Sequence, residues 1–508
     1  MKNIFKDYVA VFRFFEEISD IPRGSGNEKG IADYIEKFAN TRGHYCKRDA
    51  LNNVFVRKKA SMGRENAPSV LFQAHTDMVC VARADKRIDF LNEPIDLLTD
   101  GKFIFADGTS LGADDGVGVA LMLALIDEEE LDAPETEYLF TVSEETGMDG
   151  ANGFDYSEIH SHLIINLDSS EEFVAYVGCA GGVRADAVIP VERVKTEGKI
   201  CEIEISGLAS GHSGTEIDKN RKSATKLLAF ALNRIYKGYP FHIVELSGGT
   251  KENVIPISAK ARLAFADNFE AKKAKATLSD VKKELLGVLS KEDRKKFAVK
   301  FSSVGNTQDT SENTVSQNEW EKIINGGMLS LKSSSTLISM LMLSPQGVTD
   351  RYSGKNDLPG EVAGSVNLGT IKTEENEAVL SYLIRSANPF YSNKTFEEIE
   401  RLSHICGGTV TARERYPGWD AREGESLQLL YANACAELYG KKAELLRVHA
   451  GLECGIISEG LRLCGITPEI ISIGPNNYDI HTVSEKVEIE SLERLYEIIK
   501  MMLKKFQF

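Results

Sequence analysis

The feature that most constrains the fold is an alternation of helix and strand patterns that stops in mid-chain and resumes near the C-terminus. Residues 1–180 alternate helical and strand periodicity, and the same alternation returns over residues 425–505. An α/β domain that is interrupted by an insertion accounts for this return. We therefore predict a discontinuous domain of residues 1–185 and 414–508, built as a mixed sheet flanked by helices.

The intervening stretch, residues 186–413, is expected to form an inserted α+β domain. The segment ICEIEISG at 200–207 alternates strictly between apolar and polar residues, as a half-buried strand does. Further on, a predicted hairpin turns near residues 374–377, and a helix is expected at 394–405. A chain of 508 residues also exceeds what one hydrophobic core usually supports, which favours two domains.

The charge of the chain excludes several classes of partner. Its net charge is −16, which repels nucleic acid and anionic membranes. The sequence contains no predicted signal peptide or transmembrane segment. Its 8 cysteines are dispersed without a C-x-x-C pair, which is typical of reduced thiols, so we expect a cytoplasmic protein.

Five segments share one arrangement, in which an apolar strand is followed by acidic or histidine side chains in a short polar loop. They are FQAHTDM with His75 and Asp77, LGADDGVG with Asp114 and Asp115, FTVSEETG with Glu144 and Glu145, IINLDSS with Asp168, and NNYDIHT with His481. In an open α/β sheet, reactive groups collect beyond the carboxyl ends of the strands, so these loops are expected to converge on one crevice.

Each of these residues also has an ordinary structural interpretation. His75 alone would be a buried histidine with satisfied hydrogen bonds, and Asp77 would begin a turn. Asp115 would equally well cap the helix that starts at Gly116. The adjacent glutamates would be a solvated strand end, and Asp168 would be a cap.

The five segments together favour a metal site. Their side chains would bring a charge of about −4 to −5 into one pocket, where like charges repel. Two divalent cations would neutralise that charge. Mixed histidine and carboxylate ligands suit zinc, with manganese and cobalt as alternatives.

Eight motifs occur in an order that matches a known family: HTDMV, GADDGVG, SEETGMDGA, NLDS, GCAGG, SGHSG, HAGLECG and SIGP. They resemble the cytosolic aminoacyl-histidine dipeptidases of the aminoacylase/carnosinase family of di-zinc metallopeptidases. The resemblance extends from about residue 10 to the C-terminus. SEETGMDGA and HAGLECG are specific to this branch of the family.

The resemblance implies a ligand set for two zinc ions. Asp114 would bridge the ions. His75 and Asp168 would complete one site, and Glu145 and His481 the other. The chain departs from the branch in having a second aspartate after Asp114, where asparagine is usual, and this residue would add charge near the metals.

Two catalytic roles also follow from the resemblance. Glu144 would be the general base, taking a proton from the attacking water and passing it to the leaving amine. Asp77 would orient His75, as carboxylates beside ligating histidines commonly do. The bond between Asp114 and Asp115 would be a non-proline cis peptide.

The resemblance further implies substrate contacts in the inserted domain. His212 would stabilise the oxyanion, commonly from the partner subunit, and Asn253 and Arg385 match positions that bind substrate. The fork of Arg385 suits a terminal carboxylate because it can pair bidentately. Gly451 would line the pocket and permit close backbone approach.

The expected function is metal-dependent hydrolysis of unblocked dipeptides, including Xaa-His compounds such as carnosine. The inserted domain would be a lid and a dimerisation domain, giving a homodimer. An aminotripeptidase or an N-acyl amino acid deacylase on the same scaffold is the alternative enzyme. A non-catalytic peptide- or metal-binding protein is the alternative of another class, although the base and all ligands are retained.

Overall fold

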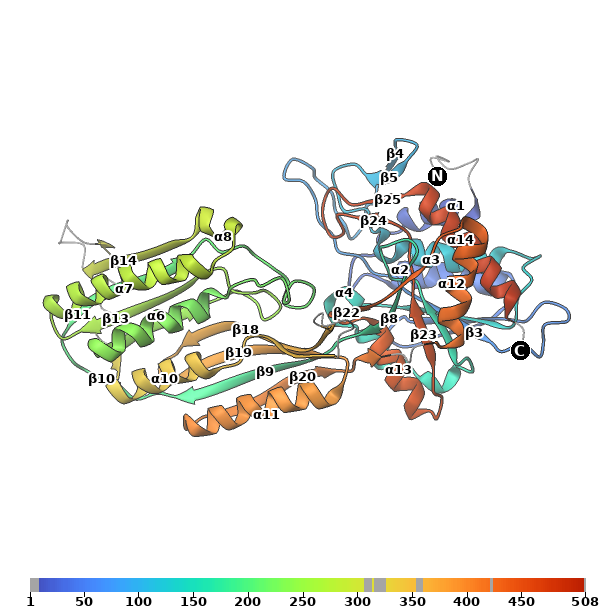
Figure 1. The fold of residues 1–508 in the computed structure, drawn as a ribbon. Coiled ribbons are helices and arrows are strands. Elements are labelled where there is room, and N and C mark those ends of the chain that lie inside the picture. Colours follow the sequence, from blue (N-terminus) through green and yellow to red (C-terminus); the bar gives the residue numbers. More distant parts are fainter. Residues whose placement is uncertain (1–8, 306–312, 315–325, 353–359, 421–423, 507–508) are drawn as a thin grey trace. The chain divides into compact units, whose positions relative to one another are not determined.

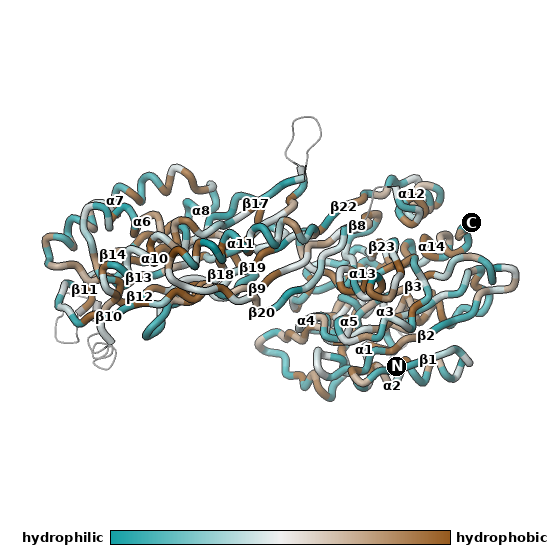
Figure 2. Tube along the Cα trace, turned by 90° about the horizontal axis from the view of Figure 1, so that it is seen from below, coloured by the Kyte–Doolittle hydropathy of each residue, from teal (hydrophilic) through white to brown (hydrophobic). Residues whose placement is uncertain are grey.

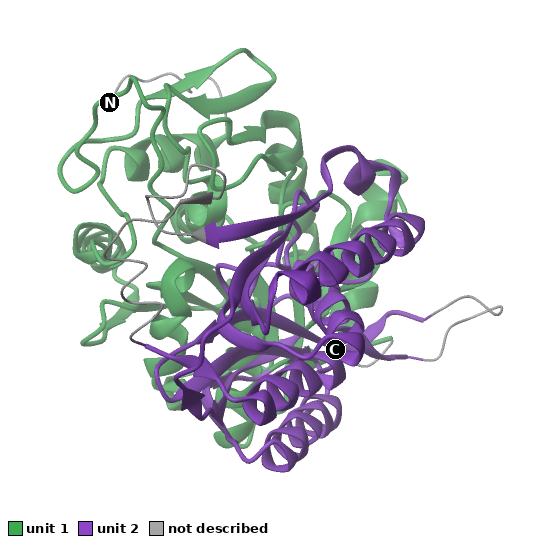
Figure 3. Cartoon of the chain, turned by 90° about the vertical axis from the view of Figure 1, so that its left-hand side faces the viewer, with its two compact units in different colours: residues 1–179, 418–448, 452–508 green, residues 180–417, 449–451 purple. Residues whose placement is uncertain are grey.

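The computed structural model describes residues 9–305, 313–314, 326–352, 360–420 and 424–506; residues 3–8 of a helix predicted at 3–18 lie outside them. The chain divides into two compact units (Figure 3). Unit 1 comprises residues 1–179, 418–448 and 452–508, and unit 2 comprises residues 180–417 and 449–451.

The insertion differs from the expected 186–413 at both ends and includes a separate segment at 449–451. At its start, strand β8 (Val174–Cys179) of unit 1 is followed after one residue by β9 (Gly181–Pro190) of unit 2. The chain passes from one sheet to the other almost without a loop, at the glycines of the GCAGG motif, residues 178–182.

Unit 1 is built on a mixed nine-stranded sheet, as the sequence predicts. Its order is β1 (Tyr45–Arg48), β2 (Val54–Lys58), β6 (Thr136–Thr141), β3 (Val70–His75), β7 (Leu163–Asn166), β23 (Glu469–Ser472), β8 and β21 (Trp419–Asp420), with β22 (Glu444–Val448) beside β8. The four central strands β6, β3, β7 and β23 are parallel, so their carboxyl ends lie at one edge.

The helices of unit 1 pack on this sheet, on the smaller sheet or on one another. They are α1 (Ala10–Ser19), α2 (Lys29–Thr41), α3 (Ala113–Asp127), α4 (Glu144–Gly147), α5 (Asp149–Gly153), η1 (Tyr156–Glu158), α12 (Ser426–Tyr439), α13 (Glu453–Leu463) and α14 (Ile489–Lys505). Helices α12 and α13 pack against β23 (Figure 1). Helix α3 is buried on all sides, which explains why its sequence has little amphipathic periodicity.

A smaller sheet joins two distant parts of unit 1. Its order is β24 (Asn477–Tyr478), β25 (Lys486–Glu488), β5 (Phe103–Ala106) and β4 (Leu97–Thr99). The pairing of β25 with β5 brings the C-terminal loop that contains His481 to the segment that leads into α3.

Unit 2 is an α+β unit with a ten-stranded sheet that is antiparallel except where β15 joins β14. Its order is β15 (Asn313–Thr314), β14 (Ala298–Gly305), β11 (Lys199–Ser206), β13 (Ala259–Phe265), β12 (His242–Gly248), β18 (Val362–Thr373), β19 (Glu377–Ser386), β9 and β20 (Thr409–Tyr416), with β17 (Gly347–Arg351) beside β18. A short pair, β10 (Arg193–Val194) and β16 (Met328–Leu329), lies apart from it. The predicted hairpin is confirmed as β18 and β19.

The helices of unit 2 are α6 (Ala224–Gly238), α7 (Asn268–Val288), α8 (Lys291–Lys296), α10 (Leu331–Leu343) and α11 (Pro389–Ile405). Helix α7 buries one stripe of small and aliphatic residues and exposes its lysines, so teal and brown alternate along it in Figure 2. Among the described residues, no helix is long and apolar enough to cross a membrane.

A first prediction concerns the core of unit 1. Phe72 of β3 is fully buried and stacks on Tyr138 of β6, with ring centroids 5.7 Å apart. Replacing Phe72 by alanine should lower the free energy of unfolding by about 3–5 kcal/mol, because it removes a buried aromatic side chain. Urea denaturation followed by circular dichroism measures this loss. Leu463→Ala is the control, since Leu463 is 83% exposed; equal losses in the two variants would contradict the packing.

Candidate metal centre

Three parallel strands present predicted site residues at adjacent carboxyl ends. His75 is the last residue of β3, Glu144 follows β6, and Asp168 follows β7. The ladder pairs His75 with Thr141, so the ends of β3 and β6 are level. The sheet therefore assembles side chains that are far apart in the sequence.

Asp114 lies between the two predicted histidine ligands. Its Oδ1 is 3.0 Å from Nε2 of His75, and its Oδ2 is 3.2 Å from Nε2 of His481. Glu145 Oε1 is 2.7 Å from the same nitrogen of His481, and Asp168 Oδ1 is 3.8 Å from that of His75. Each carboxylate oxygen of Asp114 thus faces its own histidine–carboxylate pair.

The donor atoms of this cluster fit a metal ion. One ligand atom from each of His75, Asp114 and Glu145 can be chosen so that all three lie within 4.8 Å of one another. Imidazole nitrogens and carboxylate oxygens are the ligands that zinc accepts in enzymes. Asp168 and His481 lie against the same atoms, so all five predicted ligands meet in one place.

Asp77 holds two parts of the site at once. It is fully buried, and its Oδ1 lies 3.4 Å from Nδ1 of His75. The carboxylate also accepts hydrogen bonds from the backbone N–H groups of Glu144 (3.0 Å) and Glu145 (3.3 Å) and from the hydroxyl of Ser25 (2.8 Å). It therefore fixes the start of α4, which carries both glutamates, and Nδ1 of His75 also lies 3.1 Å from the backbone carbonyl oxygen of Asp77.

Asp115 is a helix cap. Its side chain is 1% exposed and accepts a hydrogen bond from the N–H of Gly118 at 3.2 Å, within the first turn of α3. The peptide bond between Asp114 and Asp115 is cis, as the resemblance implies. The hydrogen bond to Gly118 caps the regular part of α3, which follows the non-helical Asp114 and Asp115, and Oδ2 of Asp115 is buried without a partner in the described structure.

Glu485 supports the loop of Asp114 and was missed in the sequence. Its two buried carboxylate oxygens accept hydrogen bonds from four consecutive backbone N–H groups, those of residues 111–114, at 2.8–3.3 Å. Its one sequence signal is its position, four residues after a predicted ligand, His481.

Arg23 is a second residue that the sequence did not reveal. It is 3% exposed and donates to the carbonyl oxygens of Thr76 (3.1 Å), Asp77 (3.4 Å) and Gly112 (2.5 Å). It thereby ties the end of β3 to the loop before Asp114. An isolated arginine after a helix gives no pattern from which this contact could be predicted.

The electrostatics of the cluster separate its carboxylates into different protonation states. Burial favours the neutral form of Asp114, but the hydrogen bonds from His481 and His75 outweigh it and hold its pKa far below the ordinary range. Hydrogen bonds to Asp114 and Glu145 raise the pKa of His481 to about 10. Burial, with the neighbouring carboxylates of Glu453 and Glu145, raises the pKa of Glu144 to about 8.

The residues predicted to bind substrate all lie in unit 2. Nδ1 of His212 accepts hydrogen bonds from the N–H groups of Gly214 and Thr215, both at 3.3 Å, so a neutral ring carries its hydrogen on Nε2. That nitrogen lies 3.4 Å from Nη2 of Arg385. Two donors therefore face each other, and an oxygen anion is the group that would satisfy both.

Arg385 is a buried cation without a carboxylate partner among the residues that the structure describes. Its side chain is 5% exposed, Nη1 donates to the hydroxyl of Tyr416 at 3.0 Å, and Nε has no partner in the described structure. The backbone carbonyl oxygen of Asn253 accepts a hydrogen bond at 2.9 Å from the N–H of Ser213, the residue after His212. Gly451 belongs to the separate segment 449–451, where the imidazole of His449 lies 2.7 Å from the Ser365 hydroxyl.

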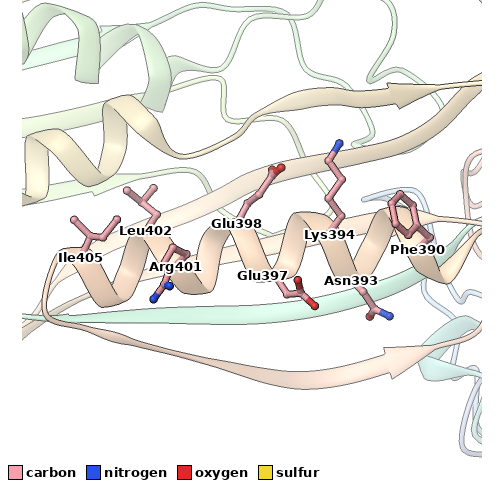
Figure 4. Close-up of a pocket in the computed structure, with 8 residues that line it drawn as sticks. All are labelled: Phe390, Asn393, Lys394, Glu397, Glu398, Arg401, Leu402 and Ile405. Carbon is pink, nitrogen blue, oxygen red and sulfur yellow. The ribbon is translucent and has the colours of Figure 1, made fainter.

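A hollow of about 740 Å³ in unit 2 contains none of these residues. Figure 4 shows its lining, which comes entirely from α11: Phe390, Asn393, Lys394, Glu397, Glu398, Arg401, Leu402 and Ile405. It carries neither a ligand set nor an unpaired buried cation, and it is separate from the predicted substrate contacts.

Comparisons with known proteins show the family and the fold. The model of peptidase family M20/M25/M40 matches residues 71–505. A cytosol non-specific dipeptidase of Escherichia coli (strain K12) is 32% identical over 495 residues, which cover 96% of this chain and 96% of that protein.

Solved structures share the architecture. The crystal structure of an aminoacylhistidine dipeptidase from Vibrio alginolyticus has a TM-score of 0.85 and 28% identity, covering 99% of this chain and 97% of that one. The aminopeptidase PepT from Bacillus cereus, with a TM-score of 0.54, 16% identity and 98% coverage of both chains, shares the fold.

The protonation of His481 predicts how metal affinity depends on pH. A ring nitrogen that holds a proton cannot bind an ion, so binding below the pKa of about 10 must release that proton. The apparent zinc affinity should therefore rise by about tenfold per pH unit for each proton released between pH 6 and 8. Competition with a chromophoric chelator, corrected for the chelator's own titration, measures this slope. His404→Ala, an exposed residue of α11 outside the cluster, should keep the slope; a flat profile in the unaltered protein would contradict the assignment.

Proposed function

Because the chain belongs to peptidase family M20/M25/M40, we propose that it is a metal-dependent dipeptidase that hydrolyses the peptide bond of unblocked dipeptides. Its relatives in Escherichia coli and Vibrio alginolyticus are named for dipeptidase activity. Xaa-His dipeptides such as carnosine fall within the proposed range, since the Vibrio protein is named for aminoacylhistidine substrates.

The observation that carries the catalytic part of this proposal is the shared position of Asp114. Its two oxygens face His75 and His481 separately, an arrangement that suits a carboxylate bridging two divalent ions. Asp168 would complete the ligands of one ion and Glu145 those of the other. Zinc is the proposed metal, with manganese and cobalt as alternatives. When bound, such ions polarise the scissile carbonyl and activate a water.

Glu144 is the proposed general base. It lies beside the proposed ligand Glu145, and burial raises the pKa of its carboxyl to about 8, a direction that makes the carboxylate a stronger proton acceptor. Asp77 accepts a hydrogen bond from the backbone N–H of Glu144 and so fixes the backbone from which the Glu144 side chain extends. In the proposed reaction Glu144 removes a proton from the water and delivers it to the leaving amine.

Arg385 and His212 supply the proposed substrate contacts. Arg385 carries a buried positive charge that lacks a carboxylate partner in the described structure, and the terminal carboxylate of a dipeptide would provide one. The hydrogen on Nε2 of His212 is available to an oxyanion. Asn253 and Gly451 would complete the contacts. The proposal also includes a homodimer and a location in the cytosol. Of these two, only the location is supported by the name of the Escherichia coli relative.

The substitution Glu144→Gln tests the base. It keeps the size of the side chain but removes its ability to accept a proton, so kcat should fall by about 10²–10⁴-fold. Zinc content should stay within error, because Glu144 is not a proposed ligand. The assay compares dipeptides, tripeptides and N-acetyl amino acids by release of free amine, with the exposed Glu171→Gln as control. A zinc- or manganese-loaded protein that cuts no dipeptide would overturn the proposal, and cleavage of only one other class would select an alternative enzyme.

The substitution Arg385→Met tests recognition of the carboxylate. A hydrogen bond to a charged group contributes about 1.5–3 kcal/mol, so kcat/KM for a dipeptide should fall by about 10- to 100-fold. The amide of the same dipeptide lacks the carboxylate and should be hydrolysed equally by both proteins. Arg385→Lys keeps the charge without the fork, so its kcat/KM for the dipeptide should lie between those of the unaltered protein and Arg385→Met. If the variant lost activity on both substrates alike, Arg385 would not be the carboxylate site.

A further inference from the structure

Glu453 is a buried carboxylate outside the proposed ligand set. It is the first residue of α13 and is fully buried. Its Oε2 accepts hydrogen bonds from Nε2 of Gln73 at 2.6 Å and from the hydroxyl of Thr141 at 2.8 Å. Its Oε1 has no partner among the described residues. A fully buried acid is costly to keep, so its contacts need an explanation.

The contacts of Glu453 continue into a network of buried side chains. Gln73 also donates to the hydroxyl of Thr141 at 3.0 Å and accepts from Nδ2 of Asn166 at 2.7 Å. Oδ1 of Asn166 in turn accepts the backbone N–H of Asp168 at 3.3 Å. Gln73, Thr141, Asn166 and Glu453 are all fully buried, so water does not compete for these bonds.

Each strand in the network leads directly to a residue of the metal centre. Gln73 of β3 lies two residues before His75, and Asn166 of β7 lies two residues before Asp168. Thr141, the last residue of β6, lies three residues before the segment that begins at Glu144. The network thus connects the ends of the three strands that present two ligands and the base.

The strand ladder alone does not set these positions fully. It fixes the backbones of β3, β6 and β7 up to their last paired residues, and the site residues lie at or beyond those ends. A network of side chains just before the strand ends limits how far these ends can rotate or move apart. Groups that hydrogen-bond directly to ligands affect metal affinity or activity by about 10- to 100-fold. Glu453 acts through one or two further side chains, so we expect an effect at the lower end of that range.

We propose that Glu453 is a positioning residue that sets the relative placement of His75, Glu144 and Asp168 through its hydrogen bonds to Gln73 and Thr141. The role rests on the metal centre of the proposed function. We ascribe the role to the hydrogen bonds that Glu453 accepts from Gln73 and Thr141. The charge of Glu453 also acts on Glu144, and Glu453→Gln separates the two effects.

The test measures zinc affinity by chelator competition on the full-length protein, without substrate. Glu453→Ala should weaken zinc binding by about tenfold or more. Glu453→Gln, whose amide oxygen can accept the same two hydrogen bonds, should stay within about threefold of the unaltered protein. Thr141→Val keeps the shape but removes the hydroxyl that donates to Glu453 and accepts from Gln73, so its zinc affinity should lie between those of the two Glu453 variants. Gln428→Ala is the matched control, since Gln428 is a buried polar residue of unit 1 on α12, away from the network.

Two results would overturn the proposal. If Glu453→Ala and Thr141→Val lowered the melting temperature of the metal-free protein but left zinc affinity unchanged, as expected of Gln428→Ala, the network would serve stability alone. If Glu453→Gln weakened binding as much as Glu453→Ala, the charge would be responsible. Should the alanine variant not fold, Thr141→Val and Glu453→Gln decide between these outcomes. Since no substrate is used, failure to cleave dipeptides would count against the proposed function and not against this role.

Discussion

The constraint on which the structure of unit 1 depends is the mutual repulsion of carboxylates gathered at one edge of a sheet. Asp77, Asp114, Glu145 and Asp168 lie within a few ångströms of the two histidines, in surroundings that exclude most of the water. Such groups separate unless other parts of the chain hold them. The neighbouring structure supplies those restraints through backbone groups: Glu485 binds four N–H groups of the loop that carries Asp114, and Arg23 binds three carbonyl oxygens around it.

The two units divide the predicted roles completely. All five proposed ligands and the base fall in unit 1, whereas His212, Asn253, Arg385 and Gly451 fall in unit 2. The chemistry of each unit fits this division, because unit 1 gathers negative charge and unit 2 holds a buried positive charge beside a histidine donor. Substrate preference could therefore change through unit 2 while the restraints around the ligands stay intact.

Sequence reasoning grouped His75, Glu144 and Asp168 because each lies at or after the end of an apolar strand, and the sheet brings these strand ends together. The same rule was wrong for Asp114, which lies in α3, and for His481, which lies between the short strands β24 and β25 of the smaller sheet. The same reasoning read the segment before His75 as wholly apolar and overlooked Gln73, whose polar side chain is fully buried in the strand. Asn166 and Thr141 were overlooked for the same reason. Glu485 and Arg23 act on backbone atoms, which have the same chemistry at every position, so no residue pattern reveals their partners. The capping role of Asp115 remained open because a helix start and a metal loop place an aspartate at the same point in the sequence.

The order of strands in unit 1 has a consequence for how the protein is made. β7 and β8 are consecutive in the chain, yet β23 lies between them in the sheet, and β23 is synthesised after the whole of unit 2. His481 and Glu485 follow later still. The nascent chain can therefore complete unit 2 while the sheet of unit 1 still has a gap at its centre and its contacts of greatest sequence separation unmade. The cluster of proposed ligands can therefore assemble only after nearly the whole chain has been synthesised, because His481 and Glu485 lie close to its C-terminus.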